Sequence, residues 1–143
     1  MYASLYAPPA TRTLSARMYQ RVGVESQLAN ADPHRLVAML FEGFMESVAQ
    51  ARGAIRGDQR GAKAAACSRA VRILEDGLRA GLNLKSGGSL ARDLDELYSY
   101  IAMRLTLANL HDDERALDEC QRLMLPLQQA WASIATDPAA TRR

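Results

Sequence analysis

The hydrophobic pattern of the chain is helical along most of its length. In four successive segments, apolar residues recur at spacings of three and four, which places them on one face of an α-helix. No segment alternates apolar and polar residues as a half-buried strand does, and none carries the Asn-Gly turn of a hairpin. The expected helices cover Pro33 to Ile55, about Ala62 to Leu84, the residues after Ser89 up to Ala108, and the residues between Asp113 and Asp137.

Capping residues stand where these helices should begin. The Asp32 carboxylate can accept hydrogen bonds from the first backbone amides of a helix, and Pro33 suits the first helical position. Ser89 is expected to cap the third helix in the same way, and Asp112 or Asp113 the fourth.

Short turns separate the helices. Gly57–Gly61 and Asn109–Asp113 are turn clusters, and Gly87 and Gly88 are free to end the second helix in a left-handed conformation. Connections of about four to six residues force neighbouring helices to run antiparallel. The sequence therefore predicts an all-α fold, an antiparallel four-helix bundle with a short N-terminal helical or extended appendage. Pro126 lies inside the last helix, where it should bend the helix or remove a hydrogen bond.

The two ends of the chain differ from the bundle in composition. Residues 1–17 carry Pro8 and Pro9 among small and polar residues and are expected to form a flexible arm. Residues 18–136 are expected to form the bundle domain, with a weak helical signal from Met18 to Ala29, and residues 137–143 a disordered tail.

Composition narrows the functional classes. The chain has 143 residues, which fits one domain, and its 18 basic and 16 acidic residues leave a net charge of +2 with no basic block that would mark a nucleic-acid partner. No segment approaches the ~18 apolar residues of a membrane span, and the N-terminus lacks the apolar core of a signal peptide. We therefore expect a cytoplasmic protein with no nucleic-acid binding, no membrane insertion, and both Cys67 and Cys120 reduced.

The residues that could carry chemistry are few. His34 and His111 both lie near helix ends, and neither has an acidic residue three positions before it, as a bundle metal site would require. Cys67 and Cys120 fall on or beside apolar faces, where buried thiols behave as small hydrophobic groups. The sequence therefore predicts no catalytic, cofactor-binding or metal-binding site, and solvated or capping roles for the two histidines.

The apolar faces are wider than a bundle needs. A surface helix uses an apolar arc of about 100°, yet the helix from Pro33 to Ile55 is apolar over on the order of half its circumference, with Phe41 and Met45 on the outer edge. The third helix carries a second stripe, Tyr100, Met103 and Leu107, opposite its main stripe of Leu94, Leu97, Ile101 and Leu105.

Three interpretations of this surplus stay open at the level of sequence. The extra residues can be isolated exposed apolar side chains, or neighbouring helices can flank both sides. They can form a groove for an apolar helix of a partner protein. They can instead bury against a second copy, which would make the chain a self-associating helical scaffold or adaptor bundle.

Several motifs together resemble those of one known protein family. Met39-Leu40-Phe41-Glu42-Gly43 is similar to the family's Met-Leu-Tyr/Phe-Asp/Glu-Gly run, and Ala31–Leu36 to its Ser-Pro-His-x-Leu helix start. Leu97-Tyr98-Ser99-Tyr100, followed by Arg104-Leu105 and Ala108-Asn109, resembles its most characteristic stretch. Further similarity lies at Tyr19 with Val22–Ser26, at Arg69–Leu78 and at Ala130-Trp131. Taken together, in this order and spacing, these motifs resemble the flagellin-specific export chaperones of the FliS family.

The resemblance implies a function that the spacing alone does not. It implies a monomer or weak homodimer that binds the C-terminal region of flagellin as helices, prevents premature polymerisation, and meets the cytosolic domain of the flagellar export gate. In the family, the N-terminal segment with the tyrosine matching Tyr19 can cover part of the apolar surface and also contacts the gate protein. The residues expected to bind partners are Tyr19, Leu40, Phe41, Phe44, Met45, Val48, Ile73, Tyr98, Tyr100, Met103 and Leu107.

Overall fold

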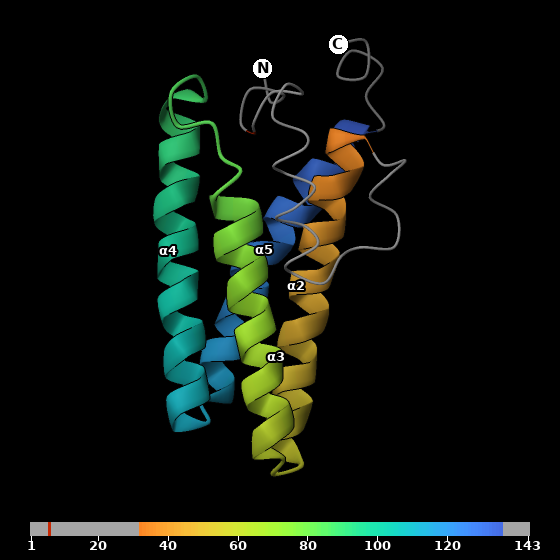
Figure 1. Ribbon diagram of the computed structural model, residues 1–143, viewed down its shortest axis with the longest axis vertical. Coiled ribbons are helices and arrows are strands. Elements are labelled where there is room, and N and C mark those ends of the chain that lie inside the picture. Colours follow the sequence, from red (N-terminus) through yellow and green to blue (C-terminus); the bar gives the residue numbers. More distant parts are fainter. Residues whose placement is uncertain (1–5, 7–31, 136–143) are drawn as a thin grey trace.

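Four helical rods run side by side in the computed structural model, which describes residue 6 and residues 32–135 (Figure 1). The rods are α2 (Pro33–Arg56), α3 (Arg60–Arg72) continuing into the π-helix η4 (Ile73–Arg79), α4 (Gly88–His111) and α5 (Glu114–Ala135). Within the described residues the only β-type pairing is an isolated bridge between Tyr6 and Leu82. Nearly all of the expected arm at 1–17, the weak helix at 18–29 and the tail at 137–143 lie outside the described residues.

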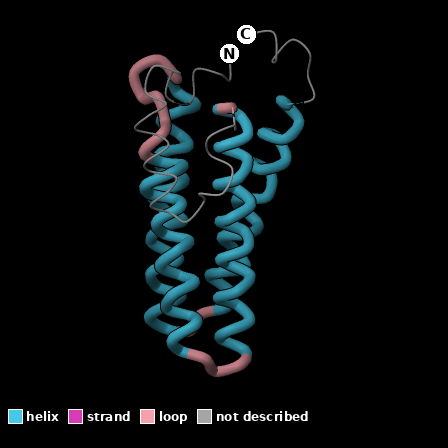
Figure 2. The backbone as a smooth tube through the Cα atoms, turned by 45° about the vertical axis from the view of Figure 1, so that its right-hand side comes forward, coloured by secondary structure: helices cyan, strands magenta, loops and turns pink. Residues whose placement is uncertain are grey.

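Consecutive rods run in opposite directions. The turns after α2 and α4 lie at one end of the bundle, and the loop at 80–87 lies at the other (Figure 2). α2 packs against α3 and α5, and α4 packs against the same two helices, so the rods close into a ring. The predicted all-α, antiparallel four-helix bundle is confirmed.

Two of the expected caps are present. Asp32 Oδ1 accepts a hydrogen bond of 2.7 Å from the Arg35 amide, and Pro33 is the first residue of α2. Asp113 Oδ1 accepts from the amides of Arg115 at 3.0 Å and Ala116 at 3.3 Å, which caps α5. Local side-chain chemistry therefore sets where these two helices begin.

The prediction for Ser89 was wrong. α4 begins at Gly88 after an N-cap at Gly87 that forms no side-chain hydrogen bond, and Ser89 is the second helical residue. Gly88 does adopt a left-handed conformation, with φ of +67°, but at the start of α4 rather than at the end of the preceding helix. Two aspartates after helices are left-handed: Asp58, with φ of 54°, follows the C-cap Gly57 of α2, and Asp112, with φ of 54°, directly follows α4.

The second rod also differs from its prediction. The sequence indicated one α-helix from about Ala62 to Leu84, but the rod begins at Arg60 and changes to a π-helix at Ile73–Arg79. The wider turn is visible in the hydrogen bond of 3.0 Å from the Ala80 amide to the Glu75 carbonyl, five residues earlier. The rod ends near Ala80, and the following chain is free to turn Leu82 inward, where it is buried.

Close approach of α2 and η4 depends on a glycine. A Cβ atom built on Gly77 would lie 2.9 Å from Leu40 Cδ2 and 3.0 Å from Leu40 Cδ1, closer than carbon atoms pack. Leu40 is fully buried against this backbone. A hydrogen at position 77 therefore lets a large α2 side chain fill the space that a methyl group would take.

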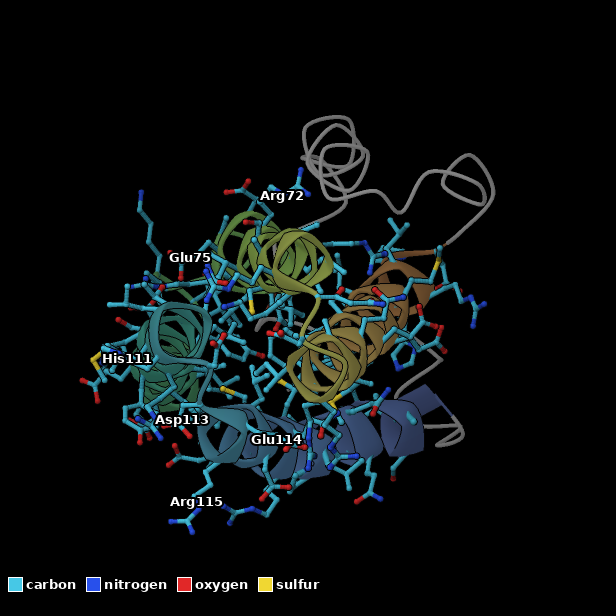
Figure 3. The ribbon with its side chains drawn as sticks, turned by 90° about the horizontal axis from the view of Figure 1, so that it is seen from below. Arg72, Glu75, His111, Asp113, Glu114 and Arg115 are labelled. Carbon is cyan, nitrogen blue, oxygen red and sulfur yellow. The ribbon has the colours of Figure 1, made fainter. Side chains whose placement is uncertain are left out.

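The core lies along the axis of the ring, as the end-on view shows (Figure 3). Its largest fully buried side chains come from all four rods: Tyr98, Phe44, Leu40, Ile73, Leu74, Leu78, Ile101, Leu105, Leu117, Met124 and Val48. Phe41, expected on the outer edge of α2, is also buried, with 3% of its surface exposed. α2 is flanked by two rods, so its wide apolar arc is largely used inside the bundle.

Polar side chains at the helix junctions are paired. Lys63 is buried on α3, where its Nζ donates to the Asn109 carbonyl at 2.8 Å and pairs with the Asp112 carboxylate, so that a cation meets the C-terminal end of α4. Between α2 and α5, Arg52 Nε donates to Glu114 Oε1 at 3.3 Å (Figure 3 labels Glu114). Arg52 also pairs with Asp118 at 3.2 Å, so ion pairs join α2 to α5 at this junction.

Candidate partner-binding surface

The structure divides the residues expected to bind partners into two groups. Six are in the core, with at most 3% of their surface exposed: Leu40, Phe41, Phe44, Val48, Ile73 and Tyr98. Four reach the surface in full or in part: Met45, Tyr100, Met103 and Leu107. Tyr19 lies outside the described residues. The exposed members, apart from Met45, come from one helix, α4.

The large apolar residues that reach the surface in the C-terminal half of α4 lie in one stripe. Tyr100 is 39% exposed and Met103 51%, and Leu107 is partly exposed. Leu110, which the sequence interpretation missed, extends the same side of the helix and is 71% exposed. Residues at i, i+3, i+7 and i+10 lie on one face of a helix, so we call these four residues the α4 outer stripe.

The opposite face of α4 is core. Tyr98, Ile101, Leu105 and Ala108 are all buried, with at most 1% of their surface exposed. Leu94 and Leu97, expected in the same stripe, are partly buried and pack against the core. Within the described residues, the second apolar stripe predicted on this helix therefore faces away from the core of the bundle.

A carboxylate on α5 joins one edge of the stripe. The Tyr100 hydroxyl donates to Glu119 Oε2 at 2.8 Å, and Arg104 Nε donates to Glu119 Oε1 at 2.7 Å. The hydrogen bond to Glu119 raises the pKa of Tyr100, because the carboxylate favours the protonated phenol. The same hydrogen bond, followed by that from Arg104, lowers the pKa of Glu119.

Tyr6 lies against the end of the bundle that holds the 80–87 loop. Its hydroxyl is 3.0 Å from the hydroxyl of Tyr98, and its ring meets Trp131 edge-on with centroids 5.5 Å apart. Its backbone forms the bridge with Leu82, and a Cβ on Gly81 would lie 3.2 Å from its ring. Tyr6, a residue of the expected arm, thus contacts the segment after η4 as well as α4 and α5. The small and polar residues around it in the sequence did not indicate this role.

The Tyr98 phenol, which meets the Tyr6 hydroxyl, is buried, and burial changes its pKa. Removal from water raises the pKa of Tyr98 to about 12, and the hydrogen bond with Tyr6, the smaller of the two effects, lowers it. Tyr98 therefore stays protonated across the physiological range. It serves as a neutral partner for the Tyr6 hydroxyl.

His34 and Trp131 pair reciprocally beside Tyr6. The Trp131 indole donates to the His34 carbonyl at 3.0 Å, and His34 Nε2 donates to the Trp131 carbonyl at 2.7 Å. The two rings stack with centroids 4.8 Å apart and planes 8° apart. The expectation of a solvated or capping histidine was therefore wrong for His34, which ties the start of α2 to the end of α5. His111 is exposed as the last residue of α4.

The two thiols are free and buried. Removal from water raises the pKa of Cys120 to about 12 and raises that of Cys67 as well. Both groups therefore remain protonated and poorly nucleophilic. Across the described residues, no group of three or more histidine, cysteine, aspartate or glutamate side chains is placed to hold a metal ion. None of the described helices has the length and apolarity needed to cross a membrane.

Comparisons with known proteins converge on one family. The family model described as flagellar protein FliS matches residues 15–138. The flagellar secretion chaperone FliS of Salmonella typhimurium is 39% identical over 119 residues, which cover 83% of this chain and 88% of that protein. The flagellar secretion chaperone FliSB of Pseudomonas aeruginosa is 40% identical over 119 residues, 83% of this chain and 94% of that protein. The Escherichia coli chaperone FliS is 33% identical over 135 residues, 94% and 96% of the two chains.

Proposed function

The chain belongs to the flagellar protein FliS family, and from that membership we propose that it is an export chaperone for flagellin. It binds the C-terminal region of flagellin, which folds into helices on the apolar surface of the bundle. Binding prevents premature polymerisation in the cytoplasm. The chaperone then hands the subunit to the cytosolic domain of the flagellar type III export gate. No step of this function requires a cofactor or a catalytic residue.

The observation that carries the proposal is the α4 outer stripe. Four apolar side chains, from Tyr100 to Leu110, are exposed in full or in part on the face of α4 that points away from the core, and α5 meets them at the Tyr100 hydroxyl. At 1.5 Å per residue the stripe is about 15 Å long, the length of roughly ten residues of a partner helix. A partner helix with apolar residues at spacings of three and four can lie along it, and Met103 can adapt to the shape of what it meets.

The other expected binding residues have different places in this proposal. Met45 is partly buried on α2 and is available at the rim. The six buried residues shape the rods from inside, and contact with flagellin would require the partner to reach between helices. Their contact with a partner, like that of Tyr19, stays a prediction.

Self-association over the same stripe is the alternative. A second copy placed on Met103 and Leu110 would bury the same side chains. Light scattering of the purified chain separates the two: a chaperone is a monomer or weak dimer that flagellin converts to a mixed complex, whereas a scaffold stays a stable dimer when flagellin is added.

Titration calorimetry with a peptide of the flagellin C-terminal region tests the proposal. Folding on binding buries roughly 1,000–3,000 Å², so the heat-capacity change should be clearly negative and circular dichroism should show a gain of helix. Absence of binding by the wild-type chain would overturn the proposal. A heat-capacity change near zero would contradict folding of the peptide.

A pair of matched variants tests the surface. Leu110→Glu places a charge on the stripe, whereas Leu125→Glu places the same charge at a leucine on α5 that is 42% exposed. We expect Leu110→Glu to weaken binding by about tenfold or more, because a buried unpaired carboxylate costs free energy, and Leu125→Glu to bind as the wild type does. Equal binding by all three proteins would show that the stripe is not the site.

A further inference from the structure

One carboxylate of α5 makes contacts that the bundle itself does not require. Glu119 uses one oxygen for the Tyr100 hydroxyl and the other for Arg104 Nε, both on α4. The two α4 residues are four positions apart and therefore neighbours on the helix surface. Since α4 and α5 already pack through buried apolar residues, an ion pair at their rim adds little to stability.

The contact with Glu119 instead restrains the side chain of Tyr100, the aromatic residue of the stripe. Tyr100 is 39% exposed, and an exposed tyrosine ordinarily samples several rotamers. Its hydroxyl is held at 2.8 Å by Glu119, which is itself held by Arg104, so the ring is fixed at one end of the α4 outer stripe. A ring fixed in this way stands beside Met103 before any partner arrives.

We propose that Glu119 is a positioning residue of the partner-binding surface, which holds the Tyr100 ring in the conformation that receives the partner helix. This inference rests on the proposed function and names a residue that sequence reasoning did not select. Glu119 acts through Tyr100 and does not itself touch the partner. Its effect is to order a side chain in advance, so that binding does not have to immobilise it.

The pKa shifts agree with this arrangement. The carboxylate raises the pKa of Tyr100 above its ordinary value of 10.0, and the Tyr100 hydrogen bond lowers that of Glu119 below its ordinary value of 4.5. Both shifts follow from a bond that favours a protonated phenol and an ionised carboxylate. Tyr100 is therefore protonated and Glu119 ionised in the neutral range, which are the states that this hydrogen bond requires.

The test compares Glu119→Ala with a matched control. Glu114 is a second carboxylate of α5 that binds arginine, and its side chain is 30% exposed against 28% for Glu119, but it faces α2 instead of the stripe. We expect Glu119→Ala to weaken binding of the flagellin C-terminal peptide by roughly three- to tenfold, the cost of immobilising one side chain. Glu114→Ala should bind as the wild type does. Both variants should unfold at nearly the wild-type denaturant concentration.

A double variant separates positioning from direct contact. If Glu119 acts through Tyr100, the double variant of Tyr100→Ala with Glu119→Ala should bind no more weakly than Tyr100→Ala alone. Additive losses would mean that Glu119 contacts the partner directly, and the inference would fail. Glu119→Gln keeps one acceptor oxygen for the Tyr100 hydroxyl and should restore part of the affinity.

A titration of Tyr100 provides a readout that a purely structural role would not move. In Glu119→Ala the pKa of Tyr100 should fall towards 10.0 without a change in the unfolding midpoint. An unchanged tyrosine titration would show that the tether is absent in solution and would overturn the inference. Failure of the wild-type chain to bind the peptide would contradict the proposed function itself, whereas wild-type binding that Glu119→Ala leaves intact would overturn only the role of Glu119.

Discussion

Two residues on α4, two positions apart, should respond in opposite ways to the same truncation. Ile101 is fully buried in the core, whereas Met103 is 51% exposed on the outer stripe. Ile101→Ala and Met103→Ala both leave a methyl group at a helical position. The difference between them therefore reports where each side chain points.

The expected cost at Ile101 follows from its burial. The substitution removes an ethyl and a methyl group, at about 0.8 kcal/mol for each buried carbon, so the transfer loss is about 2.4 kcal/mol. The cavity left behind brings the total to about 3 kcal/mol, within the range measured for such substitutions. With a urea dependence of about 2 kcal/mol per M, the unfolding midpoint should fall by roughly 1.5 M.

At Met103 the loss of stability should be small. Half of the side chain already meets water, so at most about half of a full burial free energy, or about 1 kcal/mol, is at stake. The better helix propensity of alanine offsets a small part of this loss. A midpoint shift below about 0.5 M in urea is expected.

Binding should show the reverse order. Met103→Ala should weaken the affinity for the flagellin peptide by up to about thirtyfold if Met103 is a hot spot of the surface. Ile101→Ala, measured under conditions where it is fully folded, should bind the peptide as the wild type does. Urea unfolding and calorimetry on the same preparations supply both numbers. The reasoning is refuted if Met103→Ala is as unstable as Ile101→Ala, or if it folds and binds as the wild type does.

Three further predictions concern the scaffold. Gly77→Ala should cost about 1–3 kcal/mol in chemical unfolding, because its Cβ would meet Leu40 at 2.9 Å, whereas Gly53→Ala, with no atom within 4 Å, should gain up to about 1 kcal/mol. Lys63→Met should cost about 1–3 kcal/mol by leaving the C-terminal end of α4 without its cation, and a heat-stability change below that range would count against this capping role. Folding raises the pKa of Cys120 from 9.0 to about 12. The stability that the protonated thiol contributes is therefore complete below pH 9 and falls between pH 9 and about 12, by up to ~1.4 kcal/mol per pH unit. In Cys120→Ala, the free energy of unfolding should decline less steeply over this range.

The sequence was most informative where local chemistry decides the structure. Asp32 and Asp113 were expected to cap helices and do so, because a capping carboxylate needs only the amides of its own first turn. Ser89 looked equally suitable but stands inside α4, because Gly88 takes a left-handed conformation one residue earlier and lets the helix begin there. Apolar spacing likewise predicted the second rod but not its π-helix, since the residues expected on the apolar face are also the ones buried in the π-helix: Ile73, Leu74, Gly77 and Leu78.

The candidate surface was only partly predictable. The stripe through Tyr100 and Met103 was visible because α4 carries apolar residues on two opposite faces. The burial of Phe41 could not be predicted, because the width of an apolar arc on one helix does not show how many neighbouring helices cover it. Glu119 and Tyr6 were missed since their roles depend on contacts across the bundle, from α5 to α4 and from the arm to Trp131.

The pairing of His34 with Trp131 has a consequence for how the protein is made. These residues lie 97 positions apart, and the contact between them closes the ring of rods at the junction of α2 and α5. A ribosome delivers α2 first and α5 last, so the nascent chain exposes the apolar flank of α2 until nearly all of the bundle has been synthesised. Before its last helix emerges, this chain is therefore in the same condition as the flagellin segment it is proposed to protect.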